Sequence, residues 1–299
     1  MIQLPLISVI MPVFNSEKFL KEAVNAIMQQ TFQSFELIAI DDGSSDNSVQ
    51  ILKTIESQDD RLKVLQNDHR GAAEARNLGI ERAKGDFICF VDSDDLFHKD
   101  MLSEFYSKAV LSNADIVICG YRKFDNETNK KIWDFIPDKK YLQKQRLRKE
   151  EYLNEWFMVV PPSPWGKFIK KELIIKNNIR FQNLTSCNDF SFSYTLLSCA
   201  NTLAAIKWKL LFYRANNGIS ISSDRGSKAE NIVYAIENLK SNLKLLGNYA
   251  ELKNTFLERS AITCAWELKH CSSQKRNEIL DLIKRRLDQE FIEYLQPLI

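Results

Sequence analysis

"GDFICFVDSDDLF", residues 85–97, holds an apolar run that ends in three carboxylates. Residues 86–91 suit a buried strand, and Asp92, Asp94 and Asp95 follow it closely. Clustered negative charge at the end of a buried strand is unfavourable unless a positive group lies nearby. The stretch therefore predicts a strand that ends at a bound cation.

Similar apolar runs recur along the first 120 residues, with helical patterns between them. The expected strands are residues 6–13, 35–41, 62–66, 86–92 and 115–120. Apolar positions at helical spacing predict helices over 17–30 and 46–57, and 72–85 reads as a third helix that Gly85 closes. Strands that alternate with helices predict an α/β fold with a mostly parallel sheet covered on both faces.

Two groups of carboxylates follow strands of this expected sheet. Asp41 and Asp42 follow the strand over 35–41, as Asp92 to Asp95 follow the strand over 86–92. Ligands of such sheets bind at the carboxyl ends of the strands. We therefore expect both groups to face one crevice, which would hold a cation.

Length, composition and charge limit the kinds of protein to which this chain can belong. The chain has 299 residues, 44% of them hydrophobic, which allows one large domain or one domain with a smaller companion. The net charge of +2 argues against a nucleic-acid binder. The sequence contains no run of 18 apolar residues, so we expect no transmembrane helix. The apolar N-terminus reads as a first strand, not a signal peptide. None of the six cysteines forms a CxxC pair, so we expect free thiols, with Cys89 and Cys119 buried, as suits a reducing cytoplasm. We expect no zinc site in the protein.

The second half of the chain differs in charge and pattern. Residues 121–180 hold 15 basic and 8 acidic residues, a net of +7, and 139–149 holds six basic residues and no acidic one. This basic run is either solvated surface or a contact with anionic lipid headgroups or a diphosphate-bearing acceptor. From about residue 228 the pattern is helical, with an apolar stripe expected to pack on the main domain or, alternatively, on a membrane surface.

Several motifs occur together in a characteristic order. They lie in residues 8–48 and 71–95, then in "PWGKFIKKELI" (164–174), "NDFSFSYTLL" (188–197) and "FYRANNGISIS" (212–222). This series resembles the family 2 glycosyltransferases over roughly residues 6–222. The resemblance implies the GT-A fold, a Rossmann-like mostly parallel sheet with helices on both faces, plus a C-terminal helical extension. It implies a catalytic domain over 1–225, with a nucleotide-sugar part (1–120) and an acceptor part (121–225), and a helical region over 226–299.

The resemblance also implies a nucleotide-diphosphate-sugar donor, with UDP as the nucleotide, and one Mn²⁺ or Mg²⁺. Asp94 matches the direct metal ligand, and Asp92 would hold the ribose or the metal with its water. Asp95 is expected to be structural, as a cap of the following helix. Asp42 matches the carboxylate that accepts from the uracil ring, supported by Asp41. The other residues expected at the nucleotide are Pro12, Val13, Phe14, Asn15, Arg76 and Ser93.

On the acceptor side, the resemblance places the general base at Asp189. Asn188 stands where the family usually has glutamate, so the role of that first residue is open. Trp165 and Lys167 match the acceptor side, where an indole can pack on a sugar or in the core. Tyr213 and Arg214 belong to a late loop that would close over the donor diphosphate.

The resemblance implies an inverting glycosyltransferase that acts on a glycan or lipid-linked glycan, as in lipopolysaccharide or capsule assembly. We expect it in the cytoplasm or peripherally on the inner face of the cytoplasmic membrane. One alternative is an Asp-x-Asp phosphohydrolase, but the first strand ends in "MPVFN" without its aspartate. The other is a non-catalytic nucleotide-sugar binder, which Asn188 leaves open.

Overall fold

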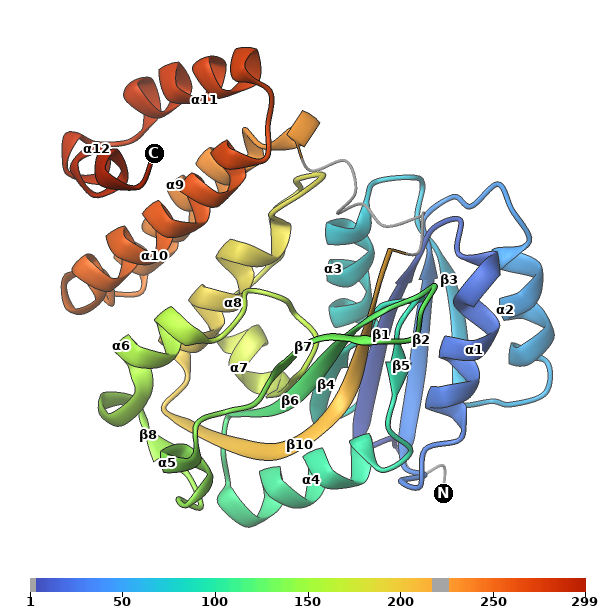
Figure 1. Ribbon diagram of the computed structural model, residues 1–299. Coiled ribbons are helices and arrows are strands. Elements are labelled where there is room, and N and C mark those ends of the chain that lie inside the picture. Colours follow the sequence, from blue (N-terminus) through green and yellow to red (C-terminus); the bar gives the residue numbers. More distant parts are fainter. Residues whose placement is uncertain (1–3, 217–225) are drawn as a thin grey trace. The chain divides into compact units, whose positions relative to one another are not determined.

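The computed structural model of the chain describes residues 4–216 and 226–299 (Figure 1). The chain divides into two compact units. The sheet unit comprises residues 1–151, 164–180 and 200–218. The helical unit comprises residues 152–163, 181–199 and 219–299. The chain thus passes between the units several times, and the functional division expected at residue 225 stays a prediction.

The sheet unit is built on one sheet with the strand path β3-β2-β1-β4-β9-β6-β10-β5. β1 pairs in parallel with β2 and β4, β2 with β3, and β6 with β10, whereas β9 is antiparallel to β4 and β6. This confirms the predicted α/β fold with a mostly parallel sheet. The strands are β1 (Ile7–Val13), β2 (Phe35–Asp41), β3 (Leu62–Gln66), β4 (Phe87–Phe90), β5 (Leu96–Phe97), β6 (Ile116–Asp125), β7 (Lys131–Phe135), β8 (Leu147–Arg148), β9 (Lys167–Lys170) and β10 (Thr202–Ala215).

The observed strand ends differ from the predicted ones at two places. The strand expected over 115–120 continues as β6 to Asp125, because β7 folds back on its second half and pairs with it antiparallel. The strand expected over 86–92 is regular only to Phe90, although the Val91 N–H still donates to the Ile10 carbonyl at 3.0 Å. The chain leaves the sheet just before the carboxylates, which frees Asp92 to Asp95 from the strand geometry.

Helices cover both faces of the sheet. Side chains alternate between the faces of a strand, so Val9 joins the core cluster with α1 and α4, and Ile10 faces α3. The apolar stripe predicted for α1 is buried, as expected. The helices of the sheet unit are α1 (Glu17–Met28), α2 (Ser48–Glu56), α3 (Ala72–Arg82), α4 (Met101–Ser112), α5 (Lys139–Leu142) and α7 (Lys171–Lys176).

The prediction that Gly85 closes the third helix is wrong. α3 ends at Arg82, and Ala83 is already extended. Gly85 instead lies against β1, where an added Cβ would come within 2.6 Å of the Ser8 backbone nitrogen. The glycine is required by this close backbone approach and not by a helix cap.

The helical unit is formed by α8 (Asn188–Cys199), α9 (Asn231–Leu245), α10 (Tyr249–Lys269), α11 (Ser273–Arg286) and α12 (Gln289–Leu295), with most of α6 (Lys149–Val159). The apolar stripe of the last helices is buried at Ile279, Ile283 and Phe291. Within this unit α11 packs on α9 and α12 packs on α10. The stripe is therefore part of the helical unit's own core, which contradicts the alternative of an exposed stripe on a membrane.

The six cysteines, all within the described residues, form no disulfide, and Cys89 and Cys119 are buried as predicted. Burial raises the pKa of Cys119, and that of Cys264, to about 12. These thiols therefore stay protonated at neutral pH. None of the helices among residues 4–216 and 226–299 is long and apolar enough to cross a bilayer.

Candidate functional site

The ends of three neighbouring strands bring the predicted donor residues to one edge of the sheet. In the β1–β2 pairing Val13 lies opposite Asp41, and in the β1–β4 pairing Ile10 lies opposite Phe90. The loop after β1 and the loop after β4 also touch directly, because the Ser16 and Ser93 hydroxyls lie 2.8 Å apart. Both carboxylate groups therefore follow strands that end at the same edge, as the sequence predicts.

The segment after β1 is fixed by the segment after β2. Asn15 donates its backbone N–H to the Ser44 hydroxyl at 2.9 Å, and its side-chain oxygen accepts from the Ser45 N–H at 2.8 Å. Pro12 and Val13 are buried within β1. Phe14 comes next and is 42% exposed. Of these residues predicted at the nucleotide, Phe14 offers the most surface to a ligand.

Asp95 lies at the centre of the carboxylate loop and is fully buried. One of its oxygens accepts the Arg214 backbone N–H at 2.9 Å, while Oδ2 has no hydrogen-bond partner in the described part of the chain. Burial, followed by the charges of Asp94 and Asp92, raises the pKa of Asp95 well above its ordinary value. The predicted helix-cap role is wrong, since α4 begins only at Met101.

Tyr213 and Arg214 lie in β10 and not in a loop, which corrects the prediction, and Arg214 clamps the carboxylate loop from the end of this strand. Its Nε donates to the Asp94 carbonyl at 2.8 Å, beside the backbone bond to Asp95. The two terminal nitrogens donate to Asn126 at 2.9 Å and to Glu22 at 2.8 Å. The guanidinium thus holds together three segments of the sheet unit, and its contact with a diphosphate stays a prediction.

Arg76 reaches the same loop from α3. Its guanidinium forms an ion pair with Asp92 at 2.9 Å, and the arginine side chain is only 9% exposed. A largely buried pair of this kind fixes both side chains, since separating them would leave a charge without its partner. The structure therefore brings Arg76 and Asp92 together, as expected if both serve the donor.

Asp42 is occupied by groups of the chain itself. Its Oδ1 accepts from the Asn67 amide at 2.6 Å and from the Arg70 N–H at 2.8 Å, and its Oδ2 accepts from the Gly71 N–H at 2.8 Å. Gly71 immediately precedes α3, at φ 91°. Asp42 therefore fixes the entry into α3, and its reading of a base stays a prediction.

Asp41 differs from Asp42 in its contacts. Its Oδ2 accepts the Gly43 and Ser44 N–H groups at 3.2 Å each, and its buried Oδ1 has no hydrogen-bond partner among the described residues. A hollow of about 360 Å³ lies beside it, lined by Asp41, Gly43, Gln66, Asn67, Asp68 and His69. Asp41 is thus the aspartate of the pair that lines a hollow.

His69 was missed by the sequence analysis. It follows β3, which lies next to β2 in the sheet, and its ring centroid lies 5.0 Å from that of Phe14. The rule that ligands collect at strand ends, applied to the strand over 62–66 as well, would have found it. Phe14 and His69 form an aromatic pair close to the Asp41 hollow.

Two of the predicted acceptor or loop residues, Trp165 and Tyr213, belong to an aromatic group with Tyr121. Trp165 lies edge-on to Tyr121 with centroids 4.6 Å apart, and it stacks on Tyr213 at 5.5 Å. Tyr213 therefore belongs to an aromatic cluster, and its contact with a diphosphate stays a prediction. Lys167 is buried in β9 at 2% exposure, opposite Ile118.

Asp189 and Asn188 are the first two residues of α8, in the helical unit. The Asn188 side chain donates to the Leu184 carbonyl at 3.1 Å, which fixes the start of the helix. The base role of Asp189 stays a prediction. Residues 217–222 of the predicted late loop lie outside the described residues.

Comparison with known proteins agrees with this arrangement. The family model for glycosyl transferase family 2 matches residues 8–167. GlyG, a glycosyltransferase of Streptococcus pneumoniae serotype 4, is 34% identical over 224 residues, which cover 71% of this chain and 72% of GlyG.

Solved structures of two other proteins share the fold. Staphylococcus aureus TarS 1–349 in complex with UDP-GlcNAc has a TM-score of 0.65 at 20% identity, over 98% of this chain and 90% of that one. The mannosyltransferase PcManGT from Pyrobaculum calidifontis, in complex with GDP-Man and Mn²⁺, has a TM-score of 0.57 at 15% identity, over 99% of this chain and 85% of that one. These likenesses show the GT-A fold, and the family match over residues 8–167, with the 34% identity to GlyG, shows that the chain belongs to glycosyltransferase family 2.

Proposed function

We propose that the enzyme is an inverting, metal-dependent glycosyltransferase that moves a sugar from a UDP-sugar to a hydroxyl of a glycan or lipid-linked glycan. The observation that carries the proposal is the loop after β4. Three carboxylates lie there within four residues, and one buried oxygen of Asp95 has no hydrogen-bond partner in the described chain. Such an excess of negative charge is balanced when a cation binds with the donor diphosphate.

The carboxylates fit Mn²⁺ or Mg²⁺, because both ions prefer oxygen ligands and retain positions for water and phosphate. Among residues 4–216 and 226–299, no three acidic, histidine or cysteine side chains are arranged so that they could hold a metal ion by themselves. Asp94 and Asp92 would therefore hold the ion with help from the donor. The bound cation supplies positive charge that offsets the charge of the leaving diphosphate. Arg76 orients Asp92, and Arg214 holds the backbone of Asp94.

The donor nucleotide is proposed to lie over the ends of β1, β2 and β3. Phe14 and His69 offer ring faces there, Asp41 offers a carboxylate on the hollow, and Asp42 is its neighbour in the chain. Pro12, Val13, Asn15 and Ser93 complete this proposed pocket. The TarS complex with UDP-GlcNAc supports a uridine nucleotide. The PcManGT complex with GDP-Man makes a guanosine nucleotide the competing donor.

Asp189 is proposed to accept the proton of the attacking acceptor hydroxyl. As the new bond from that oxygen to the anomeric carbon forms, the bond to the diphosphate breaks, and its electron pair leaves with the diphosphate. A single displacement of this kind inverts the configuration, and a positioned carboxylate is a suitable base. Asn188 is proposed to hold the helix start in place of the family's usual glutamate.

The enzyme is proposed to work at the cytoplasmic side of a membrane that carries its acceptor. The support is the basic run over 139–149, where Lys139, Lys140, Lys144 and Arg146 are exposed. An anionic surface would attract these side chains.

The proposal is tested by offering a panel of UDP-sugars and GDP-sugars with Mn²⁺ and measuring release of the nucleotide diphosphate. One UDP-sugar should release UDP faster than all GDP-sugars, and its release should stop when EDTA is added. A non-catalytic binder would instead be stabilised thermally by a nucleotide sugar without releasing its diphosphate. An Asp-x-Asp phosphohydrolase would release inorganic phosphate from phosphate esters.

A further inference from the structure

We infer that four rings of the sheet unit form a platform that binds a pyranose ring of the acceptor. This inference rests on the proposed glycosyl transfer and adds a substrate subsite to it. The aromatic platform consists of Tyr121 on β6, Trp133 on β7, Trp165 before β9 and Tyr213 on β10. It would take a saccharide by stacking, with the C–H face of the sugar on the rings.

The platform is organised around the buried ring of Tyr121. Trp165 lies 4.6 Å from it and Trp133 lies 5.2 Å from it, both edge-on, with ring planes at 85° and 66°. Tyr213 stacks against Trp165, with ring centroids 5.5 Å apart and ring planes at 21°. Neighbouring rings thus fix each other's orientation, which gives a ligand a preformed surface.

The platform lies at the same sheet edge as the carboxylate loop. Tyr213 directly precedes Arg214, whose backbone N–H donates to Asp95. Lys123 lies opposite Tyr213 in the β6–β10 pairing and opposite Trp133 in the β6–β7 pairing. Trp165 comes just before β9, and the start of that antiparallel strand lies beside the carboxyl end of β4, where Phe168 is opposite Cys89.

The strand order separates the platform from the nucleotide site. Phe14 and His69 follow β1 and β3, the carboxylates follow β4, and the platform lies across β9, β6 and β10. β6 is three strands away from β1, which corresponds to roughly 14 Å at the usual spacing of strands. The diphosphate and donor sugar would lie between these two places. A ring bound on the platform is therefore on the acceptor side, and the platform does not serve the nucleotide base.

Partial exposure of one ring distinguishes the platform from ordinary core packing. Tyr121 is 4% exposed, but Trp133 keeps 42% of its surface exposed on a short edge strand. A tryptophan that only filled the core would be covered. The Lys123 ammonium lies 5.5 Å from the Tyr213 ring centroid, so a polar group borders the rings. An apolar face bordered by a hydrogen-bond donor matches a pyranose, which has a C–H face and a rim of hydroxyls.

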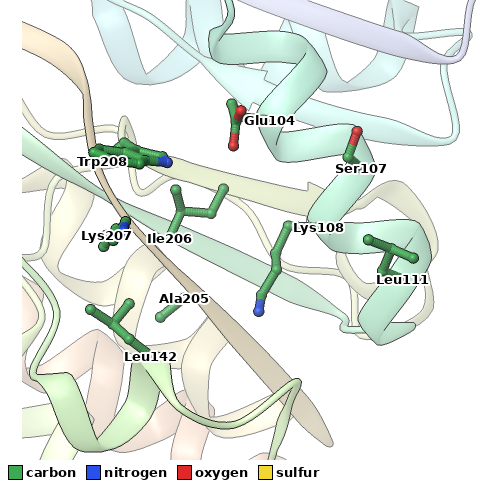
Figure 2. A pocket seen from close by; sticks show the side chains of 9 residues that line it. All are labelled: Glu104, Ser107, Lys108, Leu111, Leu142, Ala205, Ile206, Lys207 and Trp208. Carbon is green, nitrogen blue, oxygen red and sulfur yellow. The ribbon is translucent and has the colours of Figure 1, made fainter.

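The protein offers a matched control for this inference. Trp208 is 54% exposed, on a bulge of β10 between Ile206 and Leu211, with the Lys207 ammonium 4.3 Å from its ring centroid. It lines a separate hollow of about 260 Å³ with residues of α4 and α5 (Figure 2). Trp208 resembles Trp133 in exposure and in its lysine neighbour, but it is not in the platform.

The test compares Trp133→Ala and Trp208→Ala with the parent protein, in the presence of UDP and Mn²⁺. The probes are the methyl β-glycosides of glucose, galactose and N-acetylglucosamine, and their binding is followed by saturation-transfer difference NMR. We expect Trp133→Ala to weaken the best probe roughly 2- to 10-fold, which is the range for one aromatic contact. Trp133→Phe should restore part of that affinity, and Trp208→Ala should bind like the parent.

Calorimetric titration with UDP separates this inference from the proposed function. If the parent binds UDP but none of the glycosides, or if Trp133→Ala binds them as the parent does, the platform is overturned and the proposed function stands. Equal losses in Trp133→Ala and Trp208→Ala would also overturn it. If the parent does not bind UDP in Mn²⁺, the proposed function itself fails. Both tryptophans are exposed, so thermal unfolding should be nearly unchanged in all variants.

Discussion

At the scale of single residues, the loop after β4 depends on groups that are distant in the sequence. Asp95 is buried beside two other carboxylates, and its bonded partner is the backbone of Arg214, 119 residues later. A carboxylate in this setting is costly for the folded protein unless nearby donors or a cation offset its charge. The arginine clamp and the Arg76–Asp92 pair are the offsetting contacts that the described residues provide.

The side chain of Arg214 can be tested apart from its backbone. Arg214→Lys keeps the charge and the N–H bond to Asp95 but loses the separate bonds to Asp94, Asn126 and Glu22. We expect the free energy of unfolding to fall by roughly 1–3 kcal/mol, because lysine cannot reproduce the fork of donors. Urea denaturation measures this.

The control is Arg122→Lys, which changes a more exposed pair with Asp134 on the same sheet. This substitution should lower the free energy of unfolding by less than about 1 kcal/mol. Equal costs for both would contradict the clamp.

Asp42 carries a structural and a proposed recognition role, which different ligands can separate. Asp42→Ala removes the acceptor of three hydrogen bonds around the start of α3, so the protein should become less stable. If Asp42 also reads the base, its loss should weaken UDP far more than inorganic diphosphate. Calorimetry with both ligands in Mn²⁺ measures the difference. Equal weakening would limit Asp42 to the structural role and favour Asp41, which lines the neighbouring hollow.

At the scale of helices and strands, most of the donor half follows from local pattern. β1 and β2 appear where continuous apolar runs predict them, since strands buried on both faces have few polar positions. β3 also lies where it is predicted, although it is a partly exposed edge strand. β7 and the course of β9 were not predicted. β7 is short and its first three residues are exposed, and β9 inserts antiparallel between β4 and β6. Long-range pairing decides both strands, and a local pattern carries no signal for it.

The contact between α3 and the sheet is close enough to test with one methyl group. An added Cβ at Gly79 would lie 2.4 Å from Cγ2 of Ile10, which is buried in β1. Gly79→Ala should therefore lower the free energy of unfolding by roughly 1–3 kcal/mol, although alanine favours helix. Thermal and urea unfolding measure this. Glu81→Ala, on the exposed side of the same helix, should change stability by less than about 1 kcal/mol. A stabilised Gly79→Ala variant would contradict the packing described.

At the scale of the whole molecule, the two units divide the proposed work. The carboxylate loop, the Asp41 hollow and the aromatic platform are all built from the sheet unit, whereas Asp189 belongs to the helical unit. The motif series in the sequence predicts the carboxylates and Asp189, but it does not predict Tyr121 or Trp133 of the platform. It does not predict the division, because residues 152–163 and 181–199 join the C-terminal helices although they lie between strands of the sheet.

This division gives a prediction for the base. Asp189→Asn keeps the shape of the side chain and removes its negative charge, so the turnover rate should fall about 10²- to 10⁴-fold. Affinity for UDP in Mn²⁺ should stay at the parental value, because the proposed UDP site is formed by other residues. Steady-state kinetics and calorimetry measure the two quantities. Asn188→Glu, which restores the family's usual residue, should keep its activity. Parental turnover by Asp189→Asn, or retained configuration in the product by NMR, would exclude the base and the inverting mechanism.

The central claim is that the carboxylate loop after β4 binds the donor diphosphate through a divalent cation. Calorimetric titration of UDP into the parent, Asp94→Ala and Asp60→Ala, each with and without Mn²⁺, tests it most directly. Asp60 is an exposed aspartate away from the loop, so its variant controls for the loss of one negative charge. We predict that Mn²⁺ strengthens UDP binding in the parent and in Asp60→Ala, and that Asp94→Ala loses this gain, with affinity in Mn²⁺ at least about 10- to 100-fold weaker. Parental UDP affinity of Asp94→Ala in Mn²⁺ would contradict the claim.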